Sequence, residues 1–154
     1  MPFGIFVSIL CQMENNAMAG LLRVETAQRD FAPDPITDEE AAAMFRAIVN
    51  LFRLWRVTDE DAAVLIDLPV RSYRRWKAGE IGRISRDGKA RLSNLMGIHK
   101  ALRLIFVEPQ RGYDWIKRAN TEFGGKSALE VMLGGELTDL MRVRRLLDAE
   151  RGAW

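Results

Sequence analysis

The spacing of apolar residues predicts helices along most of the chain after residue 36, and it shows no alternating strand pattern. The first helix is expected after Thr37, which opens the capping box Thr37-Asp38-Glu39-Glu40. Its apolar positions recur every three or four residues, at Met44, Ile48, Leu51, Phe52 and Trp55. This stripe is expected to pack on a core and to support the stretch that follows.

The stretch from Asp59 to Gly79 has the pattern of two short helices joined by a tight turn. Thr58 is a suitable N-cap, and three carboxylates follow in the first turn, where the helix dipole favours negative charge. Asp67-Leu68-Pro69 interrupts the first helix. The second helix is expected from Val70 to Lys77, with Gly79 as its C′ residue.

The second helix of this pair has an aromatic side and a basic side. One side, turned to the core, is expected to contain Val70, Tyr73 and Trp76. The other side presents Arg71, Ser72, Arg74 and Arg75, the residue types that contact base edges and phosphates in a major groove. The alternative is an ordinary helical bundle in which this is simply a solvated basic helix.

The charge distribution favours the nucleic-acid interpretation. The net charge is only +2, but residues 68–91 contain eight basic and two acidic side chains. Arg86, Lys89 and Arg91 are candidate phosphate contacts at the start of the next helix. The predicted DNA-binding residues are Arg71, Ser72, Arg74, Arg75, Lys77, Arg83, Arg86 and Lys89.

A long helix is expected at about 86–106, with Ser85 as its cap. Its apolar seam is predicted to contain Leu92, Leu95, His99, Leu102 and Phe106. His99 is the only histidine, and no cysteine or second histidine lies near it in the sequence. A core or interface histidine is therefore favoured over a catalytic residue or a pH switch.

The C-terminal third is predicted to form a second helical module. Residues 108–112 are expected to break the chain, and a short helix opens with Tyr113, Trp115 and Ile116. After a loop at 120–125, Ser127 caps another helix, which Gly134-Gly135 ends. The last helix is expected from about Glu136 to Glu150.

Composition excludes several classes of protein. A chain of 154 residues with 48% hydrophobic residues suits one compact domain, or two small ones that share a helix. Its single cysteine allows no internal disulfide, which suits a reducing cytoplasm. No metal-ligand cluster, phosphate loop or nucleophile–base pattern is present, so we expect no catalytic residue, metal or cofactor, and no enzyme.

The first 36 residues are expected to be a flexible N-terminal tail. Their apolar patch is too short to span a bilayer, so no membrane association is expected. Met13 and Met18 are alternative start positions.

Residues 112–154 resemble the toxin-binding module of the Xre/MbcA/ParS antitoxin family. The residues that carry the resemblance are Trp115, Asn120, Phe123-Gly124-Gly125, Ser127-Ala128-Leu129-Glu130, Gly135, Val143, Leu146-Leu147 and Arg151-Gly152-Ala153-Trp154. Tyr73-Arg74-Arg75-Trp76-Lys77-Ala78-Gly79 resembles the Xre-like half of the same family. The chain departs from the family at Ala119 and Ala128, where prolines are frequent, at Asp67 for a glycine and at Pro69 for a Ser or Thr cap.

The resemblance implies an all-α chain with an Xre-like helix–turn–helix domain at 37–107, joined by a long helix to a toxin-binding module at 108–154. It implies a cytoplasmic antitoxin that blocks the NAD pocket of a RES-domain toxin and represses its own operon as a homodimer or as a hetero-oligomer with toxin. The residues expected to contact the toxin are Trp115, Met132, Arg142, Arg144, Arg145, Arg151 and Trp154. The alternatives are a free-standing helix–turn–helix regulator with a C-terminal dimerisation module, and a helical scaffold without DNA affinity.

Overall fold

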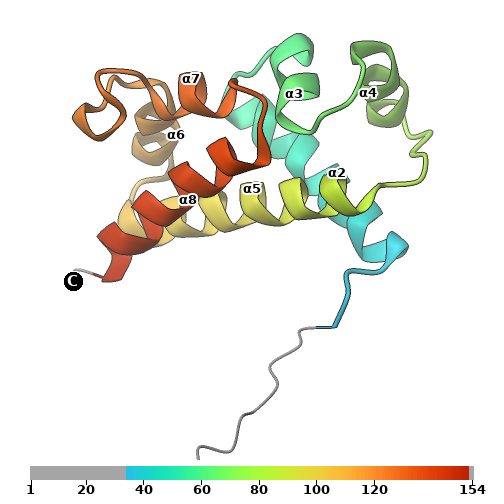
Figure 1. Ribbon diagram of the computed structural model, residues 1–154, viewed down its shortest axis with the longest axis horizontal. Helices are drawn as coiled ribbons and strands as arrows, with labels where there is room; N and C mark the ends of the chain where they lie inside the picture. The colour runs from blue at the N-terminus through green and yellow to red at the C-terminus, as the bar shows by residue number, and fades with distance from the viewer. Residues whose placement is uncertain (1–33, 153–154) are drawn as a thin grey trace, which may run out of the picture. The chain divides into compact units, whose positions relative to one another are not determined.

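The computed structural model describes residues 34–152, and every regular element in that range is a helix. The predicted all-α fold is therefore confirmed for this part of the chain. The predicted N-terminal tail lies almost entirely outside the described residues. The elements in chain order are α2 (Asp38–Leu54), α3 (Asp59–Leu65), α4 (Val70–Lys77), α5 (Arg86–Ile105), α6 (Pro109–Lys117), the 3-10 helix η1 (Thr121–Phe123), α7 (Ala128–Met132) and α8 (Leu137–Gly152) (Figure 1).

Helix α2 begins at the predicted capping box. The Thr37 hydroxyl accepts a hydrogen bond from the Glu40 amide at 3.1 Å, and the Glu40 carboxylate accepts one from the Thr37 amide at 2.8 Å. The buried face of α2 includes most of the predicted stripe, together with Phe45, which the prediction missed. Met44 is only half-buried.

Helix α5 is the central helix of residues 35–152, against which other helices pack. It packs against α2 and, most extensively, against α8, which lies alongside it in Figure 1. Leu95, Ile98 and Leu102 of α5 are fully buried in one continuous core that extends from Phe45 of α2 to Leu147 of α8. The two predicted modules therefore share one core and one helix.

Helix α6 begins earlier than the sequence suggested. The predicted chain break at 108–112 was wrong, because Pro109 occupies the first helical position, where its missing N–H costs nothing. Gly112 is buried inside the helix, and a Cβ at this position would lie 3.3 Å from Phe106 and 3.4 Å from Leu102. A larger residue here would press on Phe106 and Leu102, so glycine favours the close approach of α6 to the end of α5.

The seam of α5 also differs from the prediction at Phe106, which is half-buried at the C-cap of the helix, and at His99. Ile98 is fully buried, whereas the neighbouring His99 is half-buried at the edge of the helix pair. The His99 ring stacks on Tyr113 of α6 at a centroid distance of 6.2 Å and an interplanar angle of 20°. Burial and the nearby Arg103 guanidinium lower the pKa of His99 below its ordinary value of 6.5.

Candidate nucleic-acid interface and C-terminal module

Helices α3 and α4 are joined by a tight turn, as predicted. The Thr58 hydroxyl caps α3 by accepting a hydrogen bond from the Asp61 amide at 3.1 Å. Asp67 adopts a left-handed conformation with φ +53°, which Asp tolerates better than most residues. The Leu68 amide then donates to the Ala63 carbonyl at 2.9 Å, so the turn is closed by backbone hydrogen bonds.

The predicted inward face of α4 is confirmed. Tyr73 and Trp76 are buried, and both rings meet Phe45 of α2 edge to face, at centroid distances of 6.1 and 5.5 Å. Val70 is half-buried against the same core. These contacts fix which side of α4 faces outward.

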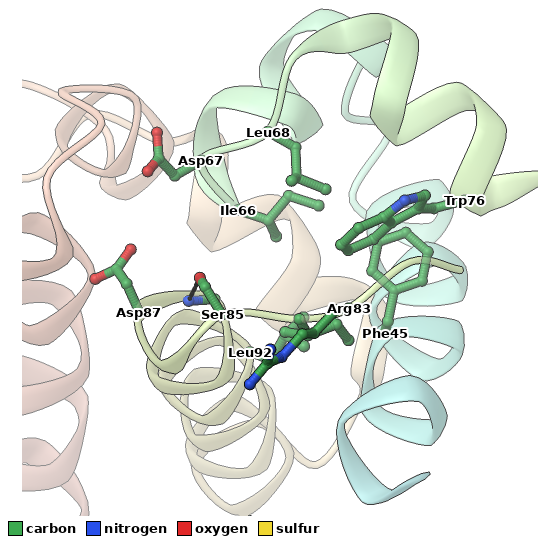
Figure 2. Close-up of a pocket in the computed structure, with 11 residues that line it drawn as sticks. Phe45, Ile66, Asp67, Leu68, Trp76, Arg83, Ser85, Asp87 and Leu92 are labelled. Atoms are coloured by element: carbon green, nitrogen blue, oxygen red, sulfur yellow. Dashed lines mark hydrogen bonds between the residues drawn. The ribbon is translucent and has the colours of Figure 1, made fainter. Parts of the chain in front are cut away.

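A small cavity of about 120 Å³ lies beneath α4 and the loop that follows it. Figure 2 shows Trp76 and Phe45 at one side of this cavity, with the Asp67 and Asp87 carboxylates at the other. The cavity is smaller than typical ligand pockets, which start at about 300 Å³. It is therefore best described as a small packing gap beneath the turn between α3 and α4.

Four predicted DNA-binding arginines are exposed and make no ion pair within residues 34–152. Arg71 and Arg75 are one helical turn apart on the outer side of α4. Arg83 lies in the loop after α4, and Arg86 lies in the first turn of α5. Ser72 is half-buried. The guanidinium groups of these four arginines are free to approach phosphates or base edges.

Two other predicted DNA-binding residues on α4 are paired with carboxylates of α3. The Arg74 guanidinium lies 2.5 Å from Glu60 and 3.4 Å from Asp59, and the Lys77 ammonium lies 2.8 Å from Asp59. The hydrogen bond from Lys77 lowers the pKa of Asp59 below its usual range. The sequence pattern did not predict these pairs, which join positions 14 to 18 residues apart.

Two other basic residues near the start of α5, Lys89 and Arg91, are also engaged. Lys89 pairs with Asp38 at 2.6 Å and donates to the Ile36 carbonyl at 2.8 Å. The suggestion that Arg91 contacts phosphate was wrong, because its side chain is 6% exposed. Arg91 instead donates to Asp87 at 2.5 Å and to the Gly135 carbonyl at 2.8 Å, and so links α5 to the loop before α8.

The loops of the C-terminal module follow their local sequence signals. The Asn120 side chain accepts a hydrogen bond from the Glu122 amide at 3.0 Å. Gly124 has a φ of +65°, a conformation that favours glycine. Ser127 and Glu130 form a second capping box at the start of α7, although α7 has only five residues.

Two of the side chains predicted to contact a toxin pack within the fold, Met132 completely and Arg144 in part, since the Arg144 side chain stays 38% exposed. Met132 is fully buried in the core, so the prediction that it contacts a partner was wrong. Arg144 lies across α5, where its Nη1 donates to Asn94 at 3.4 Å and its guanidinium fills the space over Gly97. A Cβ on Gly97 would approach that guanidinium to 2.7 Å. Arg144 thus packs α8 onto α5.

The other predicted toxin contacts within residues 34–152 are also at least partly exposed. Trp115 is half-buried and lines a hollow of about 220 Å³ between α6 and α8. The Arg142 guanidinium covers the Phe123 ring at 5.5 Å, and Arg151 pairs with Asp148 at 3.7 Å. Arg145 is exposed and makes no ion pair within the described residues. Trp154 lies outside the described residues.

Two family models match the chain, one over the helix–turn–helix part and one over the C-terminal module. The antitoxin Xre-like helix-turn-helix domain matches residues 34–97, and the antitoxin Xre/MbcA/ParS C-terminal toxin-binding domain matches residues 101–152. The chain belongs to the Xre/MbcA/ParS antitoxin family. Both matches reach into α5, so the helix–turn–helix half and the toxin-binding half of this antitoxin share one helix.

One relative of this antitoxin is the uncharacterized protein y4oB of Sinorhizobium fredii. It is 49% identical over 76 residues, which cover 49% of this chain and 57% of the relative. The match therefore spans little more than half of that protein.

Antitoxin and helix–turn–helix families are not typically enzymes. Within residues 34–152 no group of three or more His, Cys, Asp or Glu residues could hold a metal ion. No helix in the same range is long and apolar enough to cross a membrane.

Proposed function

We propose that this antitoxin acts in the cytoplasm as part of a type II toxin–antitoxin system with a RES-domain toxin. Its C-terminal module would block the NAD pocket of the toxin, and its helix–turn–helix would repress the operon of the pair, bound as a homodimer or with the toxin. The presence of both antitoxin domains in this order is the observation that carries the proposal. The toxin would consume NAD or ADP-ribosylate a target, and the antitoxin itself is not an enzyme.

The charge on the helix–turn–helix supports binding to duplex DNA. Arg71 and Arg75 extend from the outer side of α4, and Arg83 and Arg86 follow in the chain. A short exposed helix with this charge suits a major groove, and flanking arginines suit phosphates. A twofold-symmetric dimer would place two such helices on successive half-sites.

The exposed side chains of the C-terminal module support toxin binding. A protein that plugs a partner's pocket needs polar side chains with reach around an apolar or aromatic anchor. Arg142, Arg145 and Arg151 lie on exposed parts of α8, and Trp115 lines the hollow beside the same helix. These four residues, with the partly exposed Arg144 and with Trp154, remain the candidate toxin contacts.

Co-purification with the product of the neighbouring gene, followed by an NAD-consumption assay, tests the proposal. Wild-type antitoxin is expected to bind that protein and to suppress its consumption of NAD. Arg145→Glu should weaken the complex at least tenfold, which is typical of an arginine at an interface hot spot. Arg46→Glu is the matched control, since it reverses an exposed arginine on α2, away from the C-terminal module.

If the neighbouring product neither binds nor consumes NAD, the proposed partner is wrong. Duplex DNA binding without any such complex would favour the alternative of a free-standing regulator with a C-terminal dimerisation module. Equal effects of Arg145→Glu and Arg46→Glu would mean that α8 does not form the interface.

A further inference from the structure

Two carboxylates in the first turn of α3 face the last turn of α4. Asp59 receives Lys77 at 2.8 Å and Arg74 at 3.4 Å, and Glu60 receives the other end of the Arg74 guanidinium at 2.5 Å. Asp61 belongs to the same turn, but its side chain makes no ion pair within residues 34–152. One acidic turn thus contains two engaged carboxylates and one free one.

This cross-helix network compensates for a weakness of α4. The helix has eight residues, and Pro69 at its N-cap position provides no capping side chain. Helices this short are unstable without tertiary contacts. Tyr73 and Trp76 hold one side of α4, and the ion pairs hold its C-terminal half from another side.

The two helix dipoles favour the same arrangement. Carboxylates are stabilised in the first turn of a helix and cations in the last turn, and here the first turn of α3 meets the last turn of α4. The ion pairs therefore orient α4 through two carboxylates and two cations, and the dipole of its own helix already stabilises each of these charges.

We propose that Asp59 and Glu60 are positioning residues for DNA binding, which hold α4 through Arg74 and Lys77 while Arg71 and Arg75 make the contacts to DNA. This inference rests on the proposed DNA-binding function. A cation whose charge is balanced by a carboxylate releases little counterion when DNA approaches. Arg71 and Arg75 are unpaired within the described residues and are free to neutralise phosphates.

The competing interpretation is that the carboxylates mask Arg74 and Lys77 until DNA displaces them. The two interpretations predict opposite effects of removing the carboxylates. Loss of a positioning contact weakens binding, whereas loss of a mask tightens it and adds phosphate contacts.

Affinity is measured by gel shift or filter binding over a series of salt concentrations. The probes are a duplex from the region upstream of this gene and a random duplex of equal length. Arg71→Ala and Arg75→Ala should each reduce the slope of log affinity against log salt by about 0.9. Arg74→Ala should weaken binding without changing that slope.

The carboxylate variant Asp59→Asn/Glu60→Gln should bind the upstream duplex about fivefold more weakly, with the slope unchanged. Asp61→Asn is the matched control, because it removes a charge from the same turn without touching α4. It should stay within about twofold of wild type. Affinity for the random duplex should not fall, because non-specific binding depends on charge and not on the orientation of α4.

Thermal melting by circular dichroism shows whether each variant is folded at the assay temperature. If the double carboxylate variant is not, Lys77→Met breaks one pair while keeping the apolar stem of the side chain. The same result is expected from it, weaker specific binding at an unchanged slope.

Three results would overturn the inference. They are tighter binding with a steeper slope in the carboxylate variant, an equal effect of Asp61→Asn, and a slope reduction in Arg74→Ala as large as in Arg75→Ala. Wild-type protein that binds neither duplex would instead overturn the proposed DNA-binding function, and this inference with it.

Discussion

Helix α4 contains three arginines and α8 contains four, and the fold uses the two sets differently. On α4, Arg71 and Arg75 project outward because aromatic side chains on the opposite side anchor the helix. On α8, Arg144 packs across α5, and Arg142 covers Phe123. Among the described residues, the short helix α4 thus leaves two of its three arginines unpaired at the surface, whereas α8, which packs along α5, uses two of its four arginines in contacts within the fold.

The two halves of the antitoxin are joined by a common set of buried side chains. Family boundaries divide the chain between residues 97 and 101, in the middle of α5, yet buried side chains form one core across that point. We therefore expect the toxin-binding half to contribute to the stability of the helix–turn–helix half.

Removal of residues 108–154 is the strongest test of this dependence. It would uncover the side of α5 that packs against α8, where each fully buried Leu or Ile contributes about 1.5–3 kcal/mol. A few such side chains equal the typical stability of a whole domain, about 5–15 kcal/mol. Thermal melting by circular dichroism should show loss of cooperative unfolding, and DNA binding should be lost with it.

Two point variants on α5 control for this truncation. Leu102→Ala removes a side chain that is 1% exposed and should cost about 2–5 kcal/mol, while Leu104→Ala removes one that is 59% exposed and should cost little. A truncated chain that still melts cooperatively and binds DNA would show that the halves fold separately.

Local signals in the sequence predicted much of this structure. The caps at Thr37, Thr58 and Ser127 were predictable because the groups that form them lie three residues apart. The inward side of α4 was predictable from the spacing of Tyr73 and Trp76, because a two-turn helix with one aromatic side has one way to bury it.

Interactions between distant residues were not predictable. Arg91 belongs to the basic cluster in sequence, but it is buried because Gly135, 44 residues later, presents a carbonyl to it. Met132 was assigned to a partner surface, although α7 turns it into the core. Charge clusters in a sequence locate a site, and only the packing shows which members of the cluster are free.

Arg91→Ala should have a smaller effect than the truncation. The substitution leaves the Gly135 carbonyl without its donor and Asp87 without its partner, at a cost of about 2 kcal/mol, since Asp87 remains half exposed to water. Urea unfolding measures this free energy. Arg103→Ala, at an exposed arginine of the same helix, is the control. Equal stability of both variants would mean that the Arg91 link does not couple the two halves.

The smallest expected effect concerns His99, which lies where α5 meets α6. Its pKa is below 6.5 in the folded protein, so the unfolded chain binds the proton more readily than the folded one. Stability contributed by neutral His99 is therefore present above pH 6.5 and is lost as pH falls through the lowered pKa. The melting temperature should therefore fall between pH 7.5 and 5.5.

His99→Gln should remove most of that change, because His99 is the only histidine in the sequence and carboxyl groups titrate at lower pH. The Nδ1 atom of His99 is buried and has no hydrogen-bond partner within residues 34–152, so a proton placed there would be poorly solvated. If the His99→Gln variant shows the same fall in melting temperature, the pH sensitivity arises elsewhere. The contact between α5 and α6 would then be equally stable with His99 neutral or protonated.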